Sequence, residues 1–289
     1  MTRRHPDWLK VPIPGGDSYA SIKTMLRQAK LHTICEEAKC PNIAECFGAG
    51  TAVFLILGDT CTRDCRYCNV HHGTPQPPNP REPHDVAASI HTLHLTYAVI
   101  TSVTRDDLPD GGARHFHDTI HAIHTQNPTC TIEALIPDFQ GDHHALHTVL
   151  TAHPHVLNHN IEVVKDLFPH IRPHGDYTTS LHLLTHAKTI DPTITTKSGL
   201  MIGLGETTDQ IHQTLHDLRA ANVDILTIGQ YLQPTHNHEP IHRYYTPQEF
   251  QELKTHALTL GFHDVEAGPL VRSSYHAHQA YHNAHKETP

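Results

Sequence analysis

The chain has 289 residues, enough for one large α/β domain with extensions or for two ordinary domains. Its 21 Lys and Arg face 30 Asp and Glu, giving a formal charge of −9 with histidine neutral, and no basic stripe is interleaved with aromatic residues, so we expect no nucleic-acid partner. The longest strictly apolar run, at 52–57, is far below the roughly 18–20 residues of a membrane span, so no membrane partner is expected.

The N-terminal segment is rich in Pro, Gly and charge and ends in a cysteine cluster. Two arginines near its start are not followed by an apolar stretch, so we expect no secretory signal and a cytoplasmic location, where thiols stay reduced. The cluster contains Cys35, Cys40 and Cys46, spaced C-x4-C-x5-C. The chain has seven cysteines, and this odd number favours metal or redox chemistry over a disulfide framework. On spacing alone, a small structural zinc site is an alternative.

From residue 51 onward, short apolar runs alternate with helical patterns. This alternation predicts βαβ units and a parallel sheet. We therefore predict an α/β protein, with a partial (β/α)6 TIM-like barrel at 51–235 between an N-terminal extension at 1–50 and a C-terminal extension at 236–289. A doubly wound sheet is the alternative. The strands are expected at 51–58, 97–103, 131–137, 156–162, 196–204 and 224–232, and the helices near 84–95, 113–126, 143–152, 178–190, 208–221 and 247–260.

The segment "CTRDCRYC" starts just beyond the first expected strand and contains Cys61, Cys65 and Cys68. In parallel α/β architectures the chemistry lies at the carboxyl ends of the strands, so position and residue type agree. Thiolates at this density suit zinc or an iron–sulfur cluster, and structural zinc usually takes four ligands. A [4Fe–4S] cluster held by three cysteines leaves one iron open to a small molecule, which is the interpretation that we favour.

The 32 histidines occur mostly where surface Lys, Glu or Gln would be expected, as in "HDTIHAIHTQ". We interpret most of them as solvated surface residues. The alternative is a non-catalytic metal-binding protein. That alternative requires clusters to converge in space, such as His71–His72, His143–His144 or His236–His238.

The C-x3-C-x2-C motif on the loop after a first strand resembles the radical S-adenosylmethionine superfamily. Further segments resemble the lipoyl synthases, in that family's order, over about residues 8–278. Asn69 is a departure, because many relatives have an acidic residue there. The segments that carry the resemblance are "LHTICEEAKCPNIAECF", "FLILGDTCTRDCRYCNV", "TSVTRDDLPDGGA", "HNIE", "TKSGLMIGLGE", "GQYLQP" and "GPLVRSSYHA".

The resemblance implies two [4Fe–4S] clusters. The C-x3-C-x2-C cysteines would hold the first, whose open iron binds S-adenosylmethionine and yields a 5′-deoxyadenosyl radical. The C-x4-C-x5-C cysteines would hold an auxiliary cluster that donates sulfur, with Ser274 of "RSSY" as its fourth ligand. In an extended segment Ser273 would point to the other side. Cys130 lies before a strand, at its amino end, and we interpret it as a small buried hydrophobe.

The implied reaction inserts two sulfur atoms at C6 and C8 of an octanoyl chain on a lysine of a lipoyl carrier domain, and it uses two S-adenosylmethionine molecules per product. The implied partners are octanoylated carriers (the glycine-cleavage H protein and E2 subunits of 2-oxoacid dehydrogenases), a low-potential electron donor such as ferredoxin or flavodoxin, and an iron–sulfur carrier protein. The alternative is a radical sulfur-inserting enzyme that acts on a free small molecule.

Seven residues are expected to contact the cofactor. A glycine pair after the second strand allows close backbone approach, two polar residues of "HNIE" end the fourth strand, and two others lie near strand ends. For Glu162, an ion pair with Lys197 or Arg172 is the structural alternative, and Tyr67 has a core role as its alternative. The seven are Tyr67, Gly111, Gly112, Asn160, Glu162, Lys197 and Gln230.

Overall fold

The computed structural model describes residues 6–10, 24, 31–37, 42 and 53–285, with residues 35 and 36 described by their backbone alone. Cys40 and Cys46, two of the cysteines expected to hold an auxiliary cluster, lie outside the described residues, as does the Cys35 side chain.

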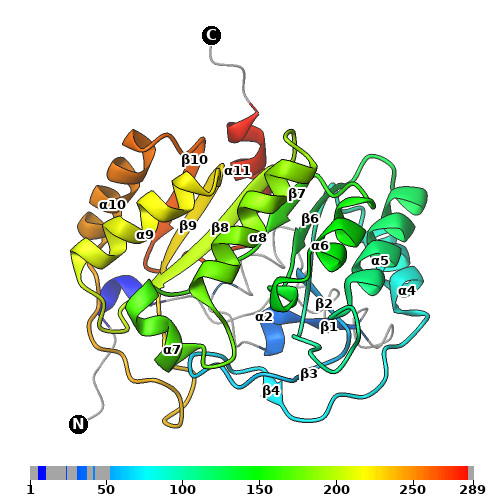
Figure 1. Ribbon diagram of the computed structural model, residues 1–289, viewed down its shortest axis with the longest axis horizontal. Coiled ribbons are helices and arrows are strands. Elements are labelled where there is room, and N and C mark those ends of the chain that lie inside the picture. Colours follow the sequence, from blue (N-terminus) through cyan, green and yellow to red (C-terminus); the bar gives the residue numbers. More distant parts are fainter. Residues whose placement is uncertain (1–5, 11–23, 25–30, 38–41, 43–52, 286–289) are drawn as a thin grey trace.

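A curved eight-stranded sheet forms the centre of the molecule, in the order β1-β2-β5-β6-β7-β8-β9-β10 (Figure 1). The first strand, β1 (His32–Thr33), is antiparallel to β2, and each later neighbouring pair is parallel. The parallel strands are β2 (Val53–Ile56), β5 (Tyr97–Ser102), β6 (Thr131–Leu135), β7 (Val156–Asn158), β8 (Thr195–Ile202), β9 (Ile225–Gln230) and β10 (Asp264–Gly268).

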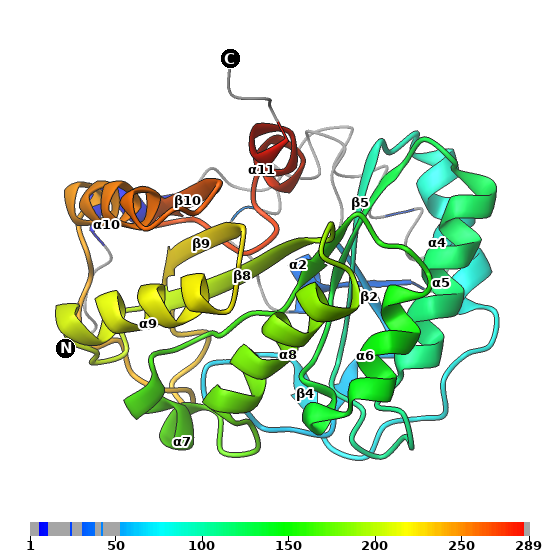
Figure 2. The ribbon, with the colours of Figure 1, turned by 45° about the horizontal axis from the view of Figure 1, so that its top comes forward.

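The parallel strands follow one another in chain order. A doubly wound sheet reverses its strand order at a switch point, so that alternative is wrong and the partial barrel is confirmed. Figures 1 and 2 show the helices outside the curved sheet. They are α4 (Glu82–Thr92), α5 (Ala113–Gln126), α6 (His143–Leu150), α8 (Tyr177–Ile190), α9 (Thr208–Ala220) and α10 (Pro247–Thr259), one after each of the six expected strands.

Local sequence signals explain where several helices begin. Thr207 and Gln210 form a capping box at α9, and Thr246 and Glu249 form another at α10. Such a box satisfies backbone N–H groups that have no partner within the helix. The side chain of Asp176 accepts a hydrogen bond from the Thr179 N–H and starts α8 in the same way.

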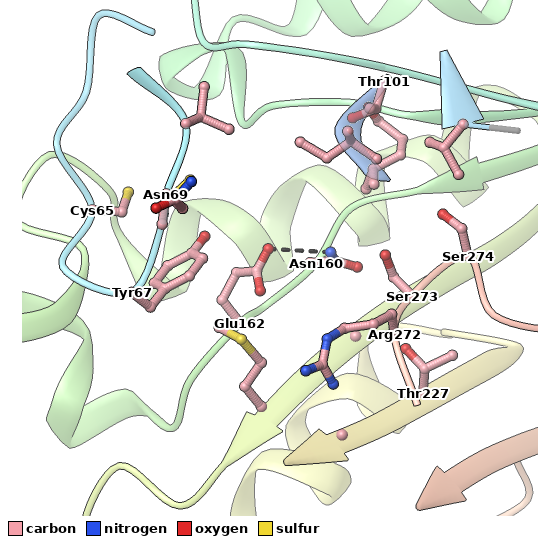
Figure 3. A pocket seen from close by; sticks show the side chains of 18 of the residues that line it. Cys65, Tyr67, Asn69, Thr101, Asn160, Glu162, Thr227, Arg272, Ser273 and Ser274 are labelled. Carbon is pink, nitrogen blue, oxygen red and sulfur yellow. Dashed lines mark hydrogen bonds between the residues drawn. The ribbon is translucent and has the colours of Figure 1, made fainter. Parts of the chain in front are cut away.

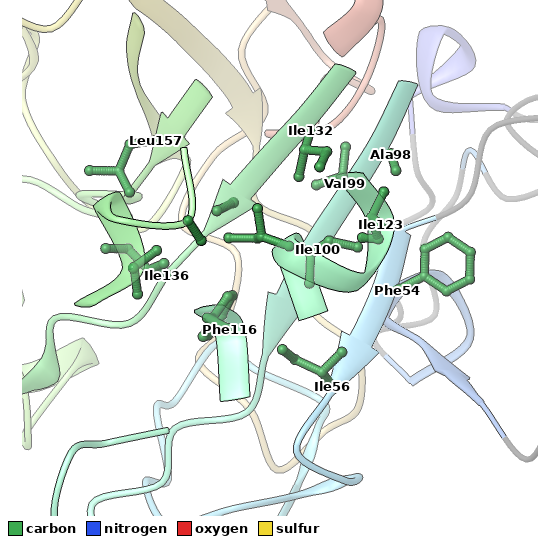
Figure 4. Close-up of a cluster of buried hydrophobic side chains, with 14 of the residues drawn as sticks. Phe54, Ile56, Ala98, Val99, Ile100, Phe116, Ile123, Ile132, Ile136 and Leu157 are labelled. Atoms are coloured by element: carbon green, nitrogen blue, oxygen red, sulfur yellow. The ribbon is translucent and has the colours of Figure 1, made fainter. Parts of the chain in front are cut away.

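Helix α5 shows how the outer layer packs. Its buried residues include Ala113, Phe116, Ile120 and Ile123, whose spacing of three and four places them on one helix face. That face packs on β2, β5 and β6, where Figure 4 shows Phe116 and Ile123 beside apolar strand residues. The histidines of such helices lie on the other faces. Among the described histidines only His159 is buried, so the interpretation of most histidines as surface residues is confirmed.

The sheet extends beyond residue 235, where the barrel was expected to end, because β10 pairs with β9. This strand has the sequence "DVEAG" and buries only Val265 completely, so it gave no apolar run to detect. After β10 the chain forms a turn and α11 (Ala277–Ala284), which lies at the amino ends of the strands (Figure 1). Its Tyr281 ring packs near Tyr97 at the start of β5, at a centroid distance of 6.3 Å.

The remaining elements are short. They are η1 (Asp7–Leu9), α2 (Ile34–Glu37), β3 (Thr60–Cys61), β4 (His71–His72), η2 (Phe139–Gly141), η3 (Lys165–Leu167) and α7 (Phe168–Ile171). Strands β3 and β4 pair in parallel on the loop that follows β2. In the part of the chain described here, no helix is both long enough and apolar enough to cross a membrane.

A buried polar network crosses the inside of the barrel. The Lys197 ammonium lies 3.1 and 3.0 Å from the two carboxylate oxygens of Glu133, and both side chains are almost completely buried. The same carboxylate accepts hydrogen bonds from the Tyr97 hydroxyl at 2.7 Å and from the Asn158 amide at 2.7 Å. Each charge is therefore paired, as buried charges must be.

Lys197→Met should lower the free energy of unfolding by about 3–5 kcal/mol, because it leaves the Glu133 carboxylate buried without its cation. Denaturant unfolding of the two proteins measures the difference. The double variant Glu133→Gln/Lys197→Met is the control. The oxygen of the new amide can accept from Asn158 and its NH2 can donate to the Tyr97 hydroxyl oxygen, so the double variant should recover most of the loss. Equal stability of the single and double variants would contradict this explanation.

Candidate active site

A cavity of about 500 Å³ opens at the carboxyl ends of the strands. Its walls come from the ends of the parallel strands, from the loop after β2 and from the segment after β10. Figure 3 shows Cys65 and Tyr67 at one end of the cavity, Ser273 and Ser274 toward the other, and Glu162 and Asn160 between them. Segments that are far apart in the sequence thus share one chamber.

The three cysteines of "CTRDCRYC" line this cavity as free, half-buried thiols. Leu57 and Gly58, with φ of 67° and 90°, turn the chain sharply out of β2 and into the loop that carries them. A turn closes between the second and third cysteines, where the Cys68 N–H donates to the Cys65 carbonyl at 3.0 Å. The structure therefore brings Cys61, Cys65 and Cys68 together, as the sequence predicted.

Burial controls the ionisation of these thiols. It raises the pKa of Cys68 to about 12. It also raises the pKa of Cys65, although the Arg172 charge opposes the shift. An iron ligand must be a thiolate, so iron binding here releases protons. The Cys61 sulfur differs in accepting two backbone N–H groups, from Arg63 at 3.4 Å and from Thr104 at 3.3 Å.

Three polar side chains that follow β7 line the cavity together with the thiols: Asn160, Glu162 and Arg172. The Asn160 amide donates to Glu162 at 3.1 Å, and Glu162 holds a left-handed backbone with φ 68°. Burial raises the pKa of Glu162, although the positive charge of Arg172 and polar contacts with Asn160 and Tyr67 act against it. Arg172 is buried and stacks on the Phe168 ring at 4.9 Å from the centroid. The site thus holds a carboxyl, an amide and a guanidinium side by side.

Several polar atoms of the cavity wall have no hydrogen-bond partner among the residues that the structure describes. They are Ser102 Oγ, Asn160 Oδ1 and Arg172 Nε. Buried polar atoms normally find a partner, so these positions suit a polar ligand. Gly199 leaves the room for it, because a Cβ there would lie 2.7 Å from Asn160 Oδ1 and 2.9 Å from Thr227 Oγ1. Three thiols beside this polar wall fit an iron–sulfur cluster that binds a zwitterionic molecule at its open iron.

The segment after β10 approaches the cavity closely. A Cβ on Gly229 would lie 2.1 Å from the Val271 carbonyl oxygen, so only glycine allows this approach. Residues 272–275 form a turn, closed by the Tyr275 N–H and the Arg272 carbonyl at 2.9 Å. The expectation of an extended segment is therefore wrong, and both Ser273 and Ser274 line the cavity.

Asn42 connects the N-terminal segment to this region. It is the one described residue between 38 and 52, and its amide donates to the Leu270 carbonyl at 2.6 Å. Asn42 stands between Cys40 and Cys46 in the sequence, and Leu270 lies four residues before Ser274. This contact links the two segments that the resemblance assigns to an auxiliary cluster.

Two family models match the chain. The radical SAM superfamily model matches residues 55–218, and the model for the N-terminal domain of lipoyl synthase matches residues 1–40. A lipoyl synthase of Xanthomonas axonopodis pv. citri is 53% identical over 277 residues, which cover 95% of this chain and 82% of that protein. One of Rubrobacter xylanophilus is 53% identical over 281 residues, covering 97% of this chain and 88% of that one. The chain belongs to the lipoyl synthase family.

Solved structures agree at the level of the fold. HydG, a maturase of the [FeFe]-hydrogenase, superposes with a TM-score of 0.58 at 11% identity, covering 93% of this chain and 69% of that one. Methylornithine synthase (PylB) gives 0.53 at 11% identity, covering 87% and 83%. The family and the fold together make this chain a radical S-adenosylmethionine enzyme.

Four of the seven residues expected to contact the cofactor do not line the cavity: Gly111, Gly112, Lys197 and Gln230. Gly111 and Gly112 open α5 and pack against Phe139 and Leu57, where a Cβ would clash. Lys197 pairs with Glu133 rather than with Glu162.

Gln230 is occupied by the backbone around it. Its amide donates to the carbonyls of Ile202, Tyr231 and Arg243, and its oxygen accepts from the Tyr245 N–H. These partners give Gln230 a structural role. Tyr67, Asn160 and Glu162 do line the cavity.

Cys130 also lies away from the cavity. Its side chain is buried in the apolar core around β5 and β6, and its thiol donates weakly to the Thr131 carbonyl at 3.6 Å. The interpretation of Cys130 as a buried hydrophobe is confirmed.

Two residues contact the site in ways that the sequence did not predict. Arg172, expected only as an ion-pair alternative for Glu162, lines the cavity, where its charge acts on Cys65 and Glu162. His238 Nε2 lies 2.9 Å from the Cys68 carbonyl oxygen, across 170 residues of chain. Within the described residues, no three His, Cys, Asp or Glu side chains are arranged to hold a single metal ion. The metal-binding alternative therefore gains no support there.

Proposed function

We propose that this enzyme inserts two sulfur atoms at C6 and C8 of an octanoyl chain attached to a lysine of a lipoyl carrier domain. The observation that supports this most is the single cavity that joins the first cysteine loop to the "RSSY" turn. The cavity lining also includes apolar residues that suit an alkyl chain, among them Val53, Leu55, Leu135, Leu200 and Met201. An octanoyl group lying there would have a cluster site toward each end.

Cys61, Cys65 and Cys68 would hold the first [4Fe–4S] cluster, each on a different iron. The polar wall would receive S-adenosylmethionine, with Asn160 and Glu162 toward its amino group and the Arg172 guanidinium toward its carboxylate. When bound to the cluster, this molecule supplies hydrogen-atom abstraction from an unactivated carbon. The residues of the chain bind and orient the reactants.

Cys35, Cys40, Cys46 and Ser274 would hold an auxiliary [4Fe–4S] cluster that is the source of sulfur. The contact from Asn42 to Leu270 supports this assignment, because it joins the two segments in which these residues lie. Oxygen is a harder ligand than thiolate, so a serine-bound iron would be released more easily. Release of iron is what a sulfur donor requires.

The partners follow from the reaction. The substrate would be carried by the H protein of glycine cleavage or by E2 subunits of 2-oxoacid dehydrogenases. A low-potential donor such as ferredoxin or flavodoxin would reduce the first cluster, and an iron–sulfur carrier protein would rebuild the auxiliary one. We propose a cytoplasmic location, where the cysteines of both clusters would stay reduced.

One anaerobic turnover on an octanoyl-lysine peptide tests this function. The reconstituted protein receives S-adenosylmethionine and a reductant, and mass spectrometry follows the peptide and 5′-deoxyadenosine. We expect a dithiolated peptide and about two deoxyadenosines per product, one for each hydrogen atom removed. Free octanoate is the control substrate and should remain unchanged. Sulfur insertion into free octanoate but not into the peptide would favour an enzyme of small molecules instead.

A further inference from the structure

Arg63 lies inside the first cysteine loop, yet its side chain points to two other loops. The guanidinium contacts the Asp106 carboxylate at 2.6 and 2.9 Å and the Asp138 carboxylate at 2.7 and 2.7 Å. Asp106 follows β5 and Asp138 follows β6, so one side chain connects three loops. Its exposed fraction is 4%, which makes this a buried, doubly bidentate arrangement.

The charges of this group are firmly coupled. Burial alone would raise the pKa of Asp138, but hydrogen bonds and the charge of Arg63 outweigh it and lower the pKa to about 2. Hydrogen bonds that involve the backbone also join the cysteine loop to the loop after β5. The Thr62 N–H and hydroxyl both donate to the Thr104 carbonyl at 3.0 Å, and the Asp106 N–H donates to the Thr62 hydroxyl at 3.1 Å. The cysteine loop is thus fastened to the loop after β5.

The two connected loops both contact the Cys61 sulfur. The two N–H groups directed at it belong to Arg63, in the cysteine loop, and to Thr104, in the loop after β5. Both can reach the sulfur only while the two loops keep their relative position. Hydrogen bonds to cluster sulfurs raise a reduction potential and orient the ligand.

We propose that Arg63 is a positioning residue for the first cluster: held between Asp106 and Asp138, it keeps two backbone N–H groups on the Cys61 sulfur and raises the reduction potential of that cluster. The inference rests on the proposed function, since it requires a cluster on Cys61. It gives a role to a residue between the cysteines that the C-x3-C-x2-C spacing leaves unspecified.

Arg63→Lys tests the geometry without removing the charge, because lysine cannot form the planar fork. Arg105→Lys is the matched control. Arg105 is also buried and forms a bidentate pair with Asp107, but its other contact is the Leu57 carbonyl, in the turn before the cysteine loop, rather than the carboxylates of Asp106 and Asp138. The holoenzyme with both clusters is titrated anaerobically with S-adenosylmethionine present, and the signal that responds to this molecule reports the first cluster.

We expect a lower midpoint potential for Arg63→Lys and roughly 10- to 100-fold weaker retention of first-cluster iron against a chelator. The Arg105→Lys potential should stay at the wild-type value. A wild-type potential in Arg63→Lys, or equal shifts in both variants, would overturn the proposal.

If Arg63→Lys does not fold, Asp106→Asn tests the same positioning role of Arg63. Removing a negative charge near the cluster would by itself raise the potential, whereas loosening the fork should lower it. A decrease supports the positioning role, and an increase or no change overturns it. If the wild-type protein shows no signal that responds to S-adenosylmethionine, the proposed function itself fails, which is a distinct result.

Discussion

Cys65→Ala should abolish formation of 5′-deoxyadenosine, with a fall in rate of at least about a thousandfold, or roughly 4 kcal/mol of activation free energy. The Cys65 thiol lines the cavity beside Tyr67 and Arg172, and it is one of only three thiols in the loop. Without it the first cluster would lose a proposed iron ligand, and a cluster needs its thiolate ligands to persist. Deoxyadenosine from the reconstituted variant, measured by mass spectrometry, checks the result.

Cys130→Ala is the matched control for this experiment. It removes a thiol of the same size from the apolar core, away from the cavity. It should keep the full iron content and form deoxyadenosine at the wild-type rate. Loss of a cluster in Cys130→Ala, or normal deoxyadenosine formation in Cys65→Ala, would contradict the assignment of the ligands.

Ser274→Ala should separate the two chemical steps. Deoxyadenosine should still form, because the first cysteine loop is untouched, but the dithiolated peptide should fall by about a hundredfold or more, equal to roughly 3 kcal/mol. The reason is that the auxiliary cluster would lack its fourth ligand. Peptide and deoxyadenosine are measured in the same reaction, so the ratio of the two products is the readout.

Ser273→Ala provides the comparison within the same turn. Both serines line the cavity, and the family pattern favours Ser274. Ser273→Ala should therefore retain sulfur insertion. The reverse result, with product lost only in Ser273→Ala, would move the ligand to the neighbouring serine. Full product from both variants would remove the serines from the auxiliary site.

Much of the fold could be predicted from local patterns. Each of the six expected strands and helices is present, because a buried strand reads as an apolar run and a packed helix repeats its apolar residues every three or four positions. The strand β10 was missed because "DVEAG" buries one side chain fully. A short strand at the edge of a sheet buries few side chains, so its sequence lacks the apolar run that marks a central strand.

The first cysteine loop could also be predicted, since its three cysteines, the proposed ligands, lie within eight residues of sequence. Their spacing and their place after a strand are local facts. A position near a strand end did not by itself identify a residue that lines the cavity. Lys197 and Gln230 are polar residues on strands, as expected, but their polar atoms bind other parts of the barrel.

The sequence by itself determined the order of strands and helices and the class of cofactor, and it indicated the loop that we propose as the binding site. Only the tertiary structure decided which distant residues share the cavity. Arg172 and the "RSSY" turn reach it from separate loops, His238 contacts the Cys68 carbonyl oxygen, and Arg63 pairs with carboxylates 43 and 75 residues away. The physical reason is that burial leaves a local periodicity in the chain, whereas the pairing of polar groups depends on where the curved sheet brings its loop ends together.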